Sequence, residues 1–267
     1  MCVYFFMSFI EINGSSIEYL RIAGAANLPT LLMLHEGLGS VTMWRDFPQK
    51  LAAATACSVF AYSRLGYGAS EPLQEGRHVR KPDFMHVEAW ETLPALRRAL
   101  GLDNVVLFGH SDGGSIALLH AARHPVEGTI VMAPHVRVEK MSITSIAAAQ
   151  VAYESTDLRA RLAKYHDDVD GAFRGWNDIW LAPEFRNWNI EAELPNIKAP
   201  ILAMQGENDE YGSMYQIEEI QRRVPGTRIL KIPLCGHSPH RDQPDQVLAL
   251  TQSFLVTLPQ RATDKAA

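Results

Sequence analysis

The stretch that most constrains this chain is residues 104–125, where a buried strand gives way to a helix within a few residues. An apolar run at 105–108 predicts the strand, and the helix after it, with one apolar face, is expected to stop at Pro125. Between them Ser111 stands in the pattern Gly-x-Ser-x-Gly. So short a reversal predicts a strained backbone at Ser111, with room only for hydrogen at Gly109, Gly113 and Gly114. The serine hydroxyl would then lie exposed beside a helix N-terminus.

Bulk properties favour an enzyme-sized α/β domain. The chain has 267 residues, 47% of them hydrophobic, which suffices for one large domain or one domain with an insertion. Its net charge of -5 suggests neither nucleic acid nor an anionic membrane as a partner. The three cysteines, Cys2, Cys57 and Cys235, show no metal-ligand spacing and leave one unpaired in any disulfide scheme. A reducing cytoplasm is therefore the expected location, with no metal site.

The N-terminus is apolar but does not read as a signal peptide. Residues 1–10 lack a basic segment and a small-residue cleavage site, and no run in the chain is long enough to span a bilayer. Met7 is an alternative start to Met1.

The rest of the chain alternates between strand and helix patterns. Asn13-Gly14 predicts a hairpin, because both residues tolerate positive φ, and Pro94 predicts a kink in the helix that contains it. The predicted strands are 8–13, 16–23, 30–34, 58–62, 105–108, 128–133, 200–205 and 227–232, and the predicted helices outside 104–125 are 43–55, 83–100, 214–224 and 243–258. This order predicts a mostly parallel, doubly wound eight-stranded sheet flanked by helices, with functional loops at the carboxyl ends of the strands.

Residues 135–195 interrupt the alternation. They carry helical patterns and several large aromatic residues but no good strand. A crossover between parallel strands needs only about a dozen residues, and this segment is several times longer. We therefore expect a helical cap at 135–195 over a core formed by 1–134 and 196–267. Ordinary crossover helices with core aromatics remain the alternative.

Two later loops carry partners for Ser111. A serine hydroxyl is a poor nucleophile unless a base lies in hydrogen-bond reach and another group orients that base. His237 follows the last predicted strand, and Asp209 follows the one before it. Glu207 and Glu210 compete with Asp209 for the acid role. His240 is a rival base, or alternatively a surface histidine.

Five ordered landmarks give the chain a resemblance that covers nearly all of it. They are His35-Glu36-Gly37-Leu38-Gly39, Arg64-Leu65-Gly66-Tyr67-Gly68, Gly109-His110-Ser111-Asp112-Gly113-Gly114, Gly206-x-x-Asp209 and Gly236-His237. In these residues and in the order serine, acid, histidine, the chain resembles a serine-type α/β-hydrolase with a cap. Such hydrolases include carboxylesterases, amino-acid ester hydrolases and meta-cleavage product hydrolases. One departure is His35-Glu36, where many members have His-Gly.

The resemblance implies a role for each residue of the site. Ser111 would attack a substrate carbonyl, His237 would act as the base, and Asp209 would orient His237. The backbone N–H groups of Gly37 and Asp112 would receive the oxyanion, with Leu38 as a nearby alternative. The chemistry needs no cofactor.

The resemblance also implies a substrate class, a small carboxylic ester cleaved through an acyl-enzyme. In similar hydrolases of α-amino-acid esters, the aspartate after the nucleophile meets an ammonium group, so Asp112 either selects amine-bearing substrates or only stabilises the helix N-terminus. Further candidate substrate contacts are Glu36, Leu38, Trp176 and Trp180. His35 is expected to shape its loop, and with His237 and His240 it lacks the further ligands that a metal site needs.

Two other functions stay open at this point. A carbon–carbon bond hydrolase acting on a ring-cleavage diketone would use the same three residues and a cationic cap residue, with Arg137 and Arg174 as candidates. A small-molecule receptor on the same fold is the second alternative. The natural substrate and the oligomeric state leave no signal in the sequence.

Overall fold

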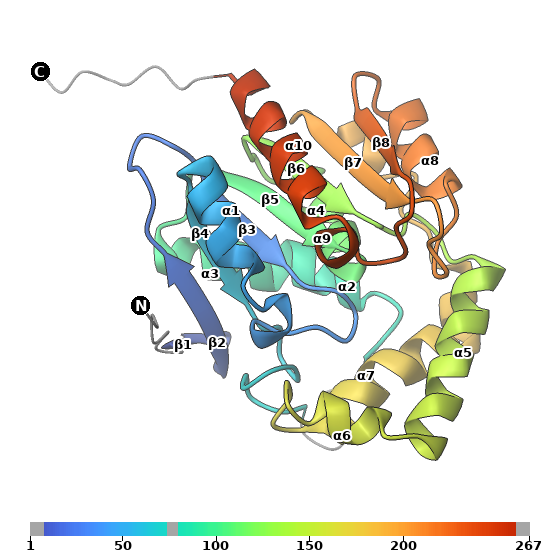
Figure 1. Cartoon of the computed structure of the whole chain (residues 1–267). Helices are drawn as coiled ribbons and strands as arrows, with labels where there is room; N and C mark the ends of the chain where they lie inside the picture. The colour runs from blue at the N-terminus through green and yellow to red at the C-terminus, as the bar shows by residue number, and fades with distance from the viewer. Residues whose placement is uncertain (1–7, 74–79, 260–267) are drawn as a thin grey trace, which may run out of the picture.

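An eight-stranded sheet forms the centre of the fold (Figure 1). The computed structural model describes residues 8–73 and 80–259, so Cys2 and the choice between Met1 and Met7 lie outside the described residues. In the order β1-β2-β4-β3-β5-β6-β7-β8, β2 pairs antiparallel with β1 and β4, and all other pairs are parallel. This arrangement is the α/β-hydrolase fold that the sequence predicted.

The elements follow the predicted order closely. The strands are β1 (Ser8–Ile12), β2 (Ser15–Ile22), β3 (Thr30–Leu34), β4 (Ser58–Tyr62), β5 (Val105–His110), β6 (Gly128–Met132), β7 (Ile201–Gly206) and β8 (Arg228–Ile232). The α-helices are α1 (Phe47–Thr55), α2 (Phe84–Val87), α3 (Leu93–Leu100), α4 (Asp112–Ala121), α5 (Lys140–Ser155), α6 (Leu158–Leu162), α7 (Val169–Leu181), α8 (Tyr215–Arg223), α9 (Pro239–Asp242) and α10 (Pro244–Thr257). Short 3-10 or π turns are η1 (Thr42–Trp44), η2 (Glu88–Thr92), η3 (Pro183–Asn187) and η4 (Leu194–Asn196).

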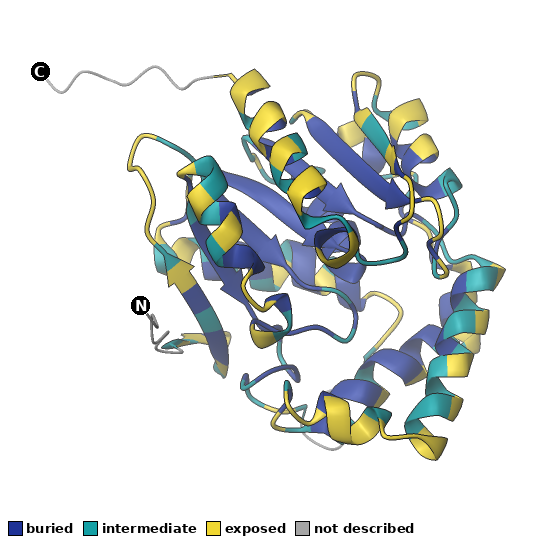
Figure 2. Cartoon of the chain, viewed as in Figure 1, coloured by how far each residue is buried: buried dark blue, intermediate teal, exposed yellow. Residues whose placement is uncertain are grey.

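Alternation along the strands divides the core between the two faces of the sheet. In β5, Val105 and Leu107 belong to the cluster packed against α3, α4 and α8, whereas Val106 and Phe108 belong to the cluster packed against α1 and α10. Figure 2 shows the central strands buried, with exposed residues on the edge strands β1 and β8 and on the outer helices. A strand buried on both faces reads as a continuous apolar run, which is why β5 was predictable.

Three predicted helices differ in detail from the observed ones. The predicted helix 43–55 is broken at Arg45, whose φ is 55°, because Pro48 has no N–H and begins a helix more readily than it continues one. The irregularity expected at Pro94 takes the form of the π turn η2, immediately before that proline. Burial in α4 extends beyond the face on which Ile116 and Leu119 were predicted to lie, to all ten residues of the helix. The reason is that α2 and η2 cover the side of α4 that faces away from the sheet.

Residues 135–195 form α5, α6, α7 and two 3-10 turns between β6 and β7. Figure 1 shows α5, α6 and α7 gathered to one side of the sheet. The only strand-like pairing within the described part of this segment is one bridge, between Arg137 and Asn189, which joins its two ends.

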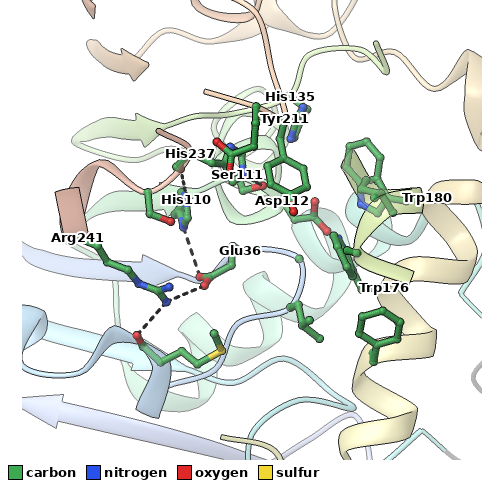
Figure 3. Close-up of a pocket in the computed structure, with 18 of the residues that line it drawn as sticks. Glu36, His110, Ser111, Asp112, His135, Trp176, Trp180, Tyr211, His237 and Arg241 are labelled. Atoms are coloured by element: carbon green, nitrogen blue, oxygen red, sulfur yellow. Dashed lines mark hydrogen bonds and ion pairs between the residues drawn. The ribbon is translucent and has the colours of Figure 1, made fainter. Parts of the chain in front are cut away.

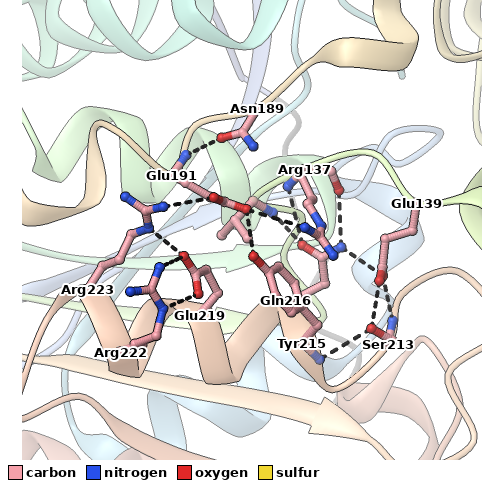
Figure 4. A network of polar contacts seen from close by, with 11 residues as sticks. Arg137, Glu139, Asn189, Glu191, Ser213, Tyr215, Gln216, Glu219, Arg222 and Arg223 are labelled. Atoms are coloured by element: carbon pink, nitrogen blue, oxygen red, sulfur yellow. Dashed lines mark hydrogen bonds and ion pairs between the residues drawn. The ribbon is translucent and has the colours of Figure 1, made fainter.

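A polar network holds both ends of this segment against α8 (Figure 4). At the first end, the Gln216 side chain accepts from the Val136 N–H at 2.7 Å and donates to Glu139 at 2.8 Å. At the second end, Glu191 accepts from Arg223 and from the Tyr215 hydroxyl, each at 2.9 Å. The segment is therefore anchored at its base. Among the described residues, no helix has both the length and the apolarity needed to cross a membrane.

Candidate active site

The turn between β5 and α4 has the strain that the sequence predicted. Ser111 has φ 53° and ψ -120°, a conformation that L-residues rarely adopt. A Cβ on Gly109 would lie 2.3 Å from the Gly113 carbonyl oxygen, and one on Gly113 would lie 2.1 Å from the Leu34 carbonyl oxygen. Only hydrogen fits at these positions, and the close packing keeps the serine in its strained backbone.

The structure brings Ser111, His237 and Asp209 together from the ends of β5, β8 and β7. The Ser111 Oγ lies 2.9 Å from His237 Nε2. On the other side of the ring, His237 Nδ1 lies 2.9 and 3.0 Å from the two Asp209 oxygens. Glu207 and Glu210 make no such contact. The three side chains form one continuous row of hydrogen bonds.

Asp209 is fixed as an ionised acceptor. Its carboxylate accepts from the Gln205 side chain at 2.6 Å and from the backbone N–H groups of Tyr211 and Gly212 at 2.8 and 3.2 Å. Burial alone would raise the pKa of Asp209, but the hydrogen bond and charge of His237 outweigh it and the pKa is lowered. Burial alone would lower the pKa of His237, and Asp209 outweighs it in turn, so that the pKa of His237 is raised. Each partner therefore stabilises the charged form of the other.

A pocket of about 310 Å³ opens over Ser111 (Figure 3). The four substrate contacts suggested by the sequence, Glu36, Leu38, Trp176 and Trp180, all line it. Its walls come from the loop after β3, from the turn after β5, and from α5 and α7. The volume is at the small end of the usual range for ligand sites, roughly 300–1,000 Å³.

The two N–H groups expected to receive an oxyanion belong to neighbouring loops. A Cβ on Gly37 would lie 2.3 Å from the Trp176 indole and 3.1 Å from Asp112 Oδ2, so Gly37 lies directly against both side chains. Among the described residues, no acceptor lies within hydrogen-bond reach of the Gly37 N–H or the Asp112 N–H. Both donors are therefore available to a ligand.

The Asp112 carboxylate is the least satisfied polar group in the pocket. Its side chain is only 1% exposed, and neither oxygen has a hydrogen-bond partner among the described residues. Burial raises its pKa, and the charge of Arg64, the neighbouring Trp180 indole N–H and the charge of Arg80 partly oppose this. That indole N–H lies outside hydrogen-bond geometry and itself has no partner among the described residues. A buried polar group without a partner is rare and needs an explanation.

The remaining histidines named by the sequence have different surroundings. His35 is buried outside the pocket lining, where its Nδ1–H donates to the Glu36 carbonyl at 2.7 Å and its Nε2 accepts from the Arg64 N–H at 3.0 Å. It shapes its loop, as expected. His240 was predicted as a rival base or a surface histidine, and neither description fits. It is buried, 4.7 Å from Trp44 between ring centroids, because an apolar recess ahead of α1 receives it.

The sequence did not single out several residues that the structure brings to the site. Tyr211 and Arg241 line the pocket, His110 contacts the His237 backbone, and Gln205 holds Asp209. Only His110 carried a usable signal, as the residue before the nucleophile. Within the described ranges, no three histidine, cysteine or acidic side chains are grouped so that they could hold a metal ion.

Comparison with known proteins agrees with this fold. The family model described as "Alpha/beta hydrolase family" matches residues 31–250. Two proteins of Mus musculus are similar: "sn-1-specific diacylglycerol lipase ABHD11", 24% identical over 92% of this chain and 87% of its own length, and "Serine hydrolase BPHL", 27% identical over 92% and 85%. The solved structure of an esterase (EaEST) from Exiguobacterium antarcticum has a TM-score of 0.76 at 18% identity, covering 94% of this chain and 100% of its own. The chain belongs to the alpha/beta hydrolase family.

Proposed function

We propose that the protein is a serine hydrolase that cleaves small carboxylic esters through an acyl-enzyme. The observation that carries the proposal is the row of hydrogen bonds from Ser111 through His237 to Asp209. Relatives named as a serine hydrolase, a lipase and an esterase support it.

In the first half of the reaction, Ser111 Oγ attacks the ester carbonyl while its proton passes to His237 Nε2. Asp209 stabilises the imidazolium that forms and holds the proton on Nδ1. The tetrahedral intermediate then collapses, and the proton on Nε2 goes to the departing alcohol. The acyl group remains on Ser111.

In the second half, water enters where the alcohol was. His237 takes a proton from this water, whose oxygen attacks the acyl carbon. The proton then returns to Ser111 Oγ as the carboxylic acid leaves. In both halves the oxyanion would be received by the N–H groups of Gly37 and Asp112, and losing one such donor costs on the order of 10²–10³ in turnover.

Asp112 supports a preference for amine-bearing esters. A buried carboxylate without a partner is costly, and a substrate ammonium would supply both the charge and the hydrogen bonds that it lacks. The same ammonium would also offset the repulsion between this carboxylate and the oxyanion that forms nearby.

The helical segment 135–195 supports an apolar acyl or alcohol group. Trp176, Trp180, Phe173 and Ile146 face the pocket from α5 and α7. We propose that this segment is the cap of the core formed by 1–134 and 196–267, and that it encloses the substrate and excludes water.

The carbon–carbon bond hydrolase has less support. Neither arginine suggested for its acidic substrate lines the pocket. The Arg137 guanidinium lies over the Tyr215 ring, 3.6 Å from its centroid, at the base of the segment.

The test is turnover of p-nitrophenyl acetate and butyrate by the wild type and by Ser111→Ala. We expect hydrolysis by the wild type and loss of nearly all of it in the variant. A receptor would bind such esters without turnover, and that result would refute the proposal. A panel of amine-bearing and neutral esters of equal size then tests Asp112, whose change to Asn should abolish the preference for the amine.

A further inference from the structure

A second imidazole and carboxylate lie beside the Ser111–His237–Asp209 row. His110 precedes Ser111 in the chain and Glu36 precedes Gly37, so each is adjacent to a group with a proposed role in the reaction. His110 Nε2 lies 2.7 Å from the His237 carbonyl oxygen, and its Nδ1 lies 3.4 Å from Glu36 Oε2. Figure 3 shows this chain of contacts running from the His237 backbone through His110 and Glu36 to Arg241.

The contacts determine where the protons of His110 lie. A carbonyl oxygen can only accept, so Nε2 must carry a proton and donate it to His237. Nδ1 faces a carboxylate oxygen, which would repel a lone pair at that distance. With acceptors on both sides, both ring nitrogens can be satisfied only by donating, and these contacts must offset the cost of charging a ring that is 1% exposed.

The surroundings of Glu36 favour its ionised form, which can pair with a charged His110. Arg241, which also lines the pocket, donates from Nη2 to Glu36 Oε1 over a distance of 3.3 Å. Burial alone would raise the pKa of Glu36, but the hydrogen bond and charge of His110, with further help from Arg241, hold it well below its usual value. A Cβ on Gly39 would lie 2.6 Å from Glu36 Oε2, so glycine there leaves the space that the carboxylate fills.

The other titratable rings around His110 do not replace Glu36. His240 lies 4.9 Å away between ring centroids, and burial keeps its pKa well below the usual value, so it is neutral. The His237 ring lies 5.2 Å away and must itself accept a proton during the proposed reaction. A lone imidazolium at that distance would oppose this protonation, whereas a pair with Glu36 carries no net charge.

We propose that His110 and Glu36 form an imidazolium–carboxylate pair that positions His237 by binding its backbone carbonyl. The proposal rests on the proposed function only in taking His237 as the base. Neither member need touch the substrate's reacting atoms. The pair connects the loop of His237 to the turn at Ser111 and to the loop of Gly37 after β3. These three parts of the site are therefore held at fixed distances from one another.

The kinetic test compares His110→Phe, which removes the donor and keeps a ring, with His110→Gln, whose amide N–H can still reach the His237 carbonyl. A displacement near 1 Å costs about 100-fold, so His110→Phe should lose about that in kcat with KM changed less than about threefold. The kcat of His110→Gln should exceed that of His110→Phe by about tenfold or more. The matched control is His120→Gln, a buried histidine distant from the site whose Nδ1–H also donates to a backbone carbonyl at 2.7 Å. Its kcat should equal that of the wild type, and the same result for His110→Phe would overturn the proposal.

A spectroscopic test does not depend on turnover or on the Phe variant folding. In protein labelled with ¹⁵N in the histidine rings, on a Ser111→Ala background, both ring nitrogens of His110 should be protonated near neutral pH. Glu36→Gln should remove the proton from Nδ1, and His110→Gln assigns the signals. If one ring nitrogen of His110 is unprotonated in the Ser111→Ala protein that retains Glu36, the proposed pair is wrong. If the wild type hydrolyses no ester, the proposed function fails, and these spectra still decide whether the pair exists.

Discussion

Replacing the buried Asp112 carboxylate should stabilise the protein while reducing its selectivity. Asp112→Asn keeps the shape of the side chain but removes a charge that has no hydrogen-bond partner among the described residues. Leaving a buried polar group unsatisfied costs about 1–3 kcal/mol, and more if it is charged. The neutral amide retains part of that cost, so we expect a gain of about 2 kcal/mol, or about 4–8 °C in Tm for a chain of this size.

The gain should depend on pH in a defined direction. Burial raises the pKa of Asp112 above its unfolded value, so the folded state binds this proton more tightly than the unfolded state does. The penalty is therefore absent below the unfolded pKa of about 4, grows as pH rises, and is complete above the folded pKa. The stabilisation by Asp112→Asn should appear at neutral pH and vanish near pH 4.

Thermal unfolding of both proteins at the two pH values measures this effect. Asp209→Asn is the matched control, because it removes a buried carboxylate of the same candidate active site that is well hydrogen-bonded and has a lowered pKa. Asp209→Asn should be less stable than the wild type at neutral pH. This loss of stability should shrink as the pH falls through the pKa of Asp209 in the folded protein. A lower Tm for Asp112→Asn would show that the carboxylate has a partner in the free protein. An equal gain at both pH values would show that the ionisation of Asp112 is not its cause, and either result would refute the reasoning.

Three further predictions follow from the geometry. Because the pKa of His237 is raised and the proposed base must be neutral, kcat/KM should rise with pH through a value above about 6.5. Asp209→Asn should move this rise to lower pH and cut kcat on the order of 10⁴-fold. A pH profile unchanged in that variant would contradict the pairing of Asp209 with His237. Gly109→Ala should lower the free energy of unfolding, measured with denaturant, by more than about 2 kcal/mol, because its Cβ would lie 2.3 Å from a backbone oxygen. Gly101→Ala, with open space around it, should lower it by only about 1 kcal/mol, and equal losses would argue against a crowded turn at Ser111. Trp176→Ala should move ester preference toward longer acyl chains in a p-nitrophenyl ester series, and an unchanged order would remove that side chain from the acyl site.

The fold and the candidate catalytic residues were largely predictable because their signals are local. A strand buried on both faces must be apolar throughout, so β3, β4 and β5 could be located within a residue or two. The reversal at Ser111 needs glycines at fixed offsets. In a parallel sheet the carboxyl ends of strands share one edge, so the loops that carry Asp209 and His237 could be assigned to the site without coordinates, and the family resemblance favoured Asp209 over Glu207 and Glu210.

Tertiary structure decided what depends on neighbours distant in the chain. The sequence could present Asp112 as a substrate contact or a helix-terminal charge, but only the tertiary structure shows its oxygens buried with no hydrogen-bond partner among the described residues. From the sequence, His240 was a rival base or a surface histidine, and His110 was marked only as the residue before the nucleophile. The first packs against Trp44, and the ring nitrogens of the second contact the His237 carbonyl and Glu36. Burial and hydrogen-bond satisfaction are properties of a whole environment, so no local pattern could have given them.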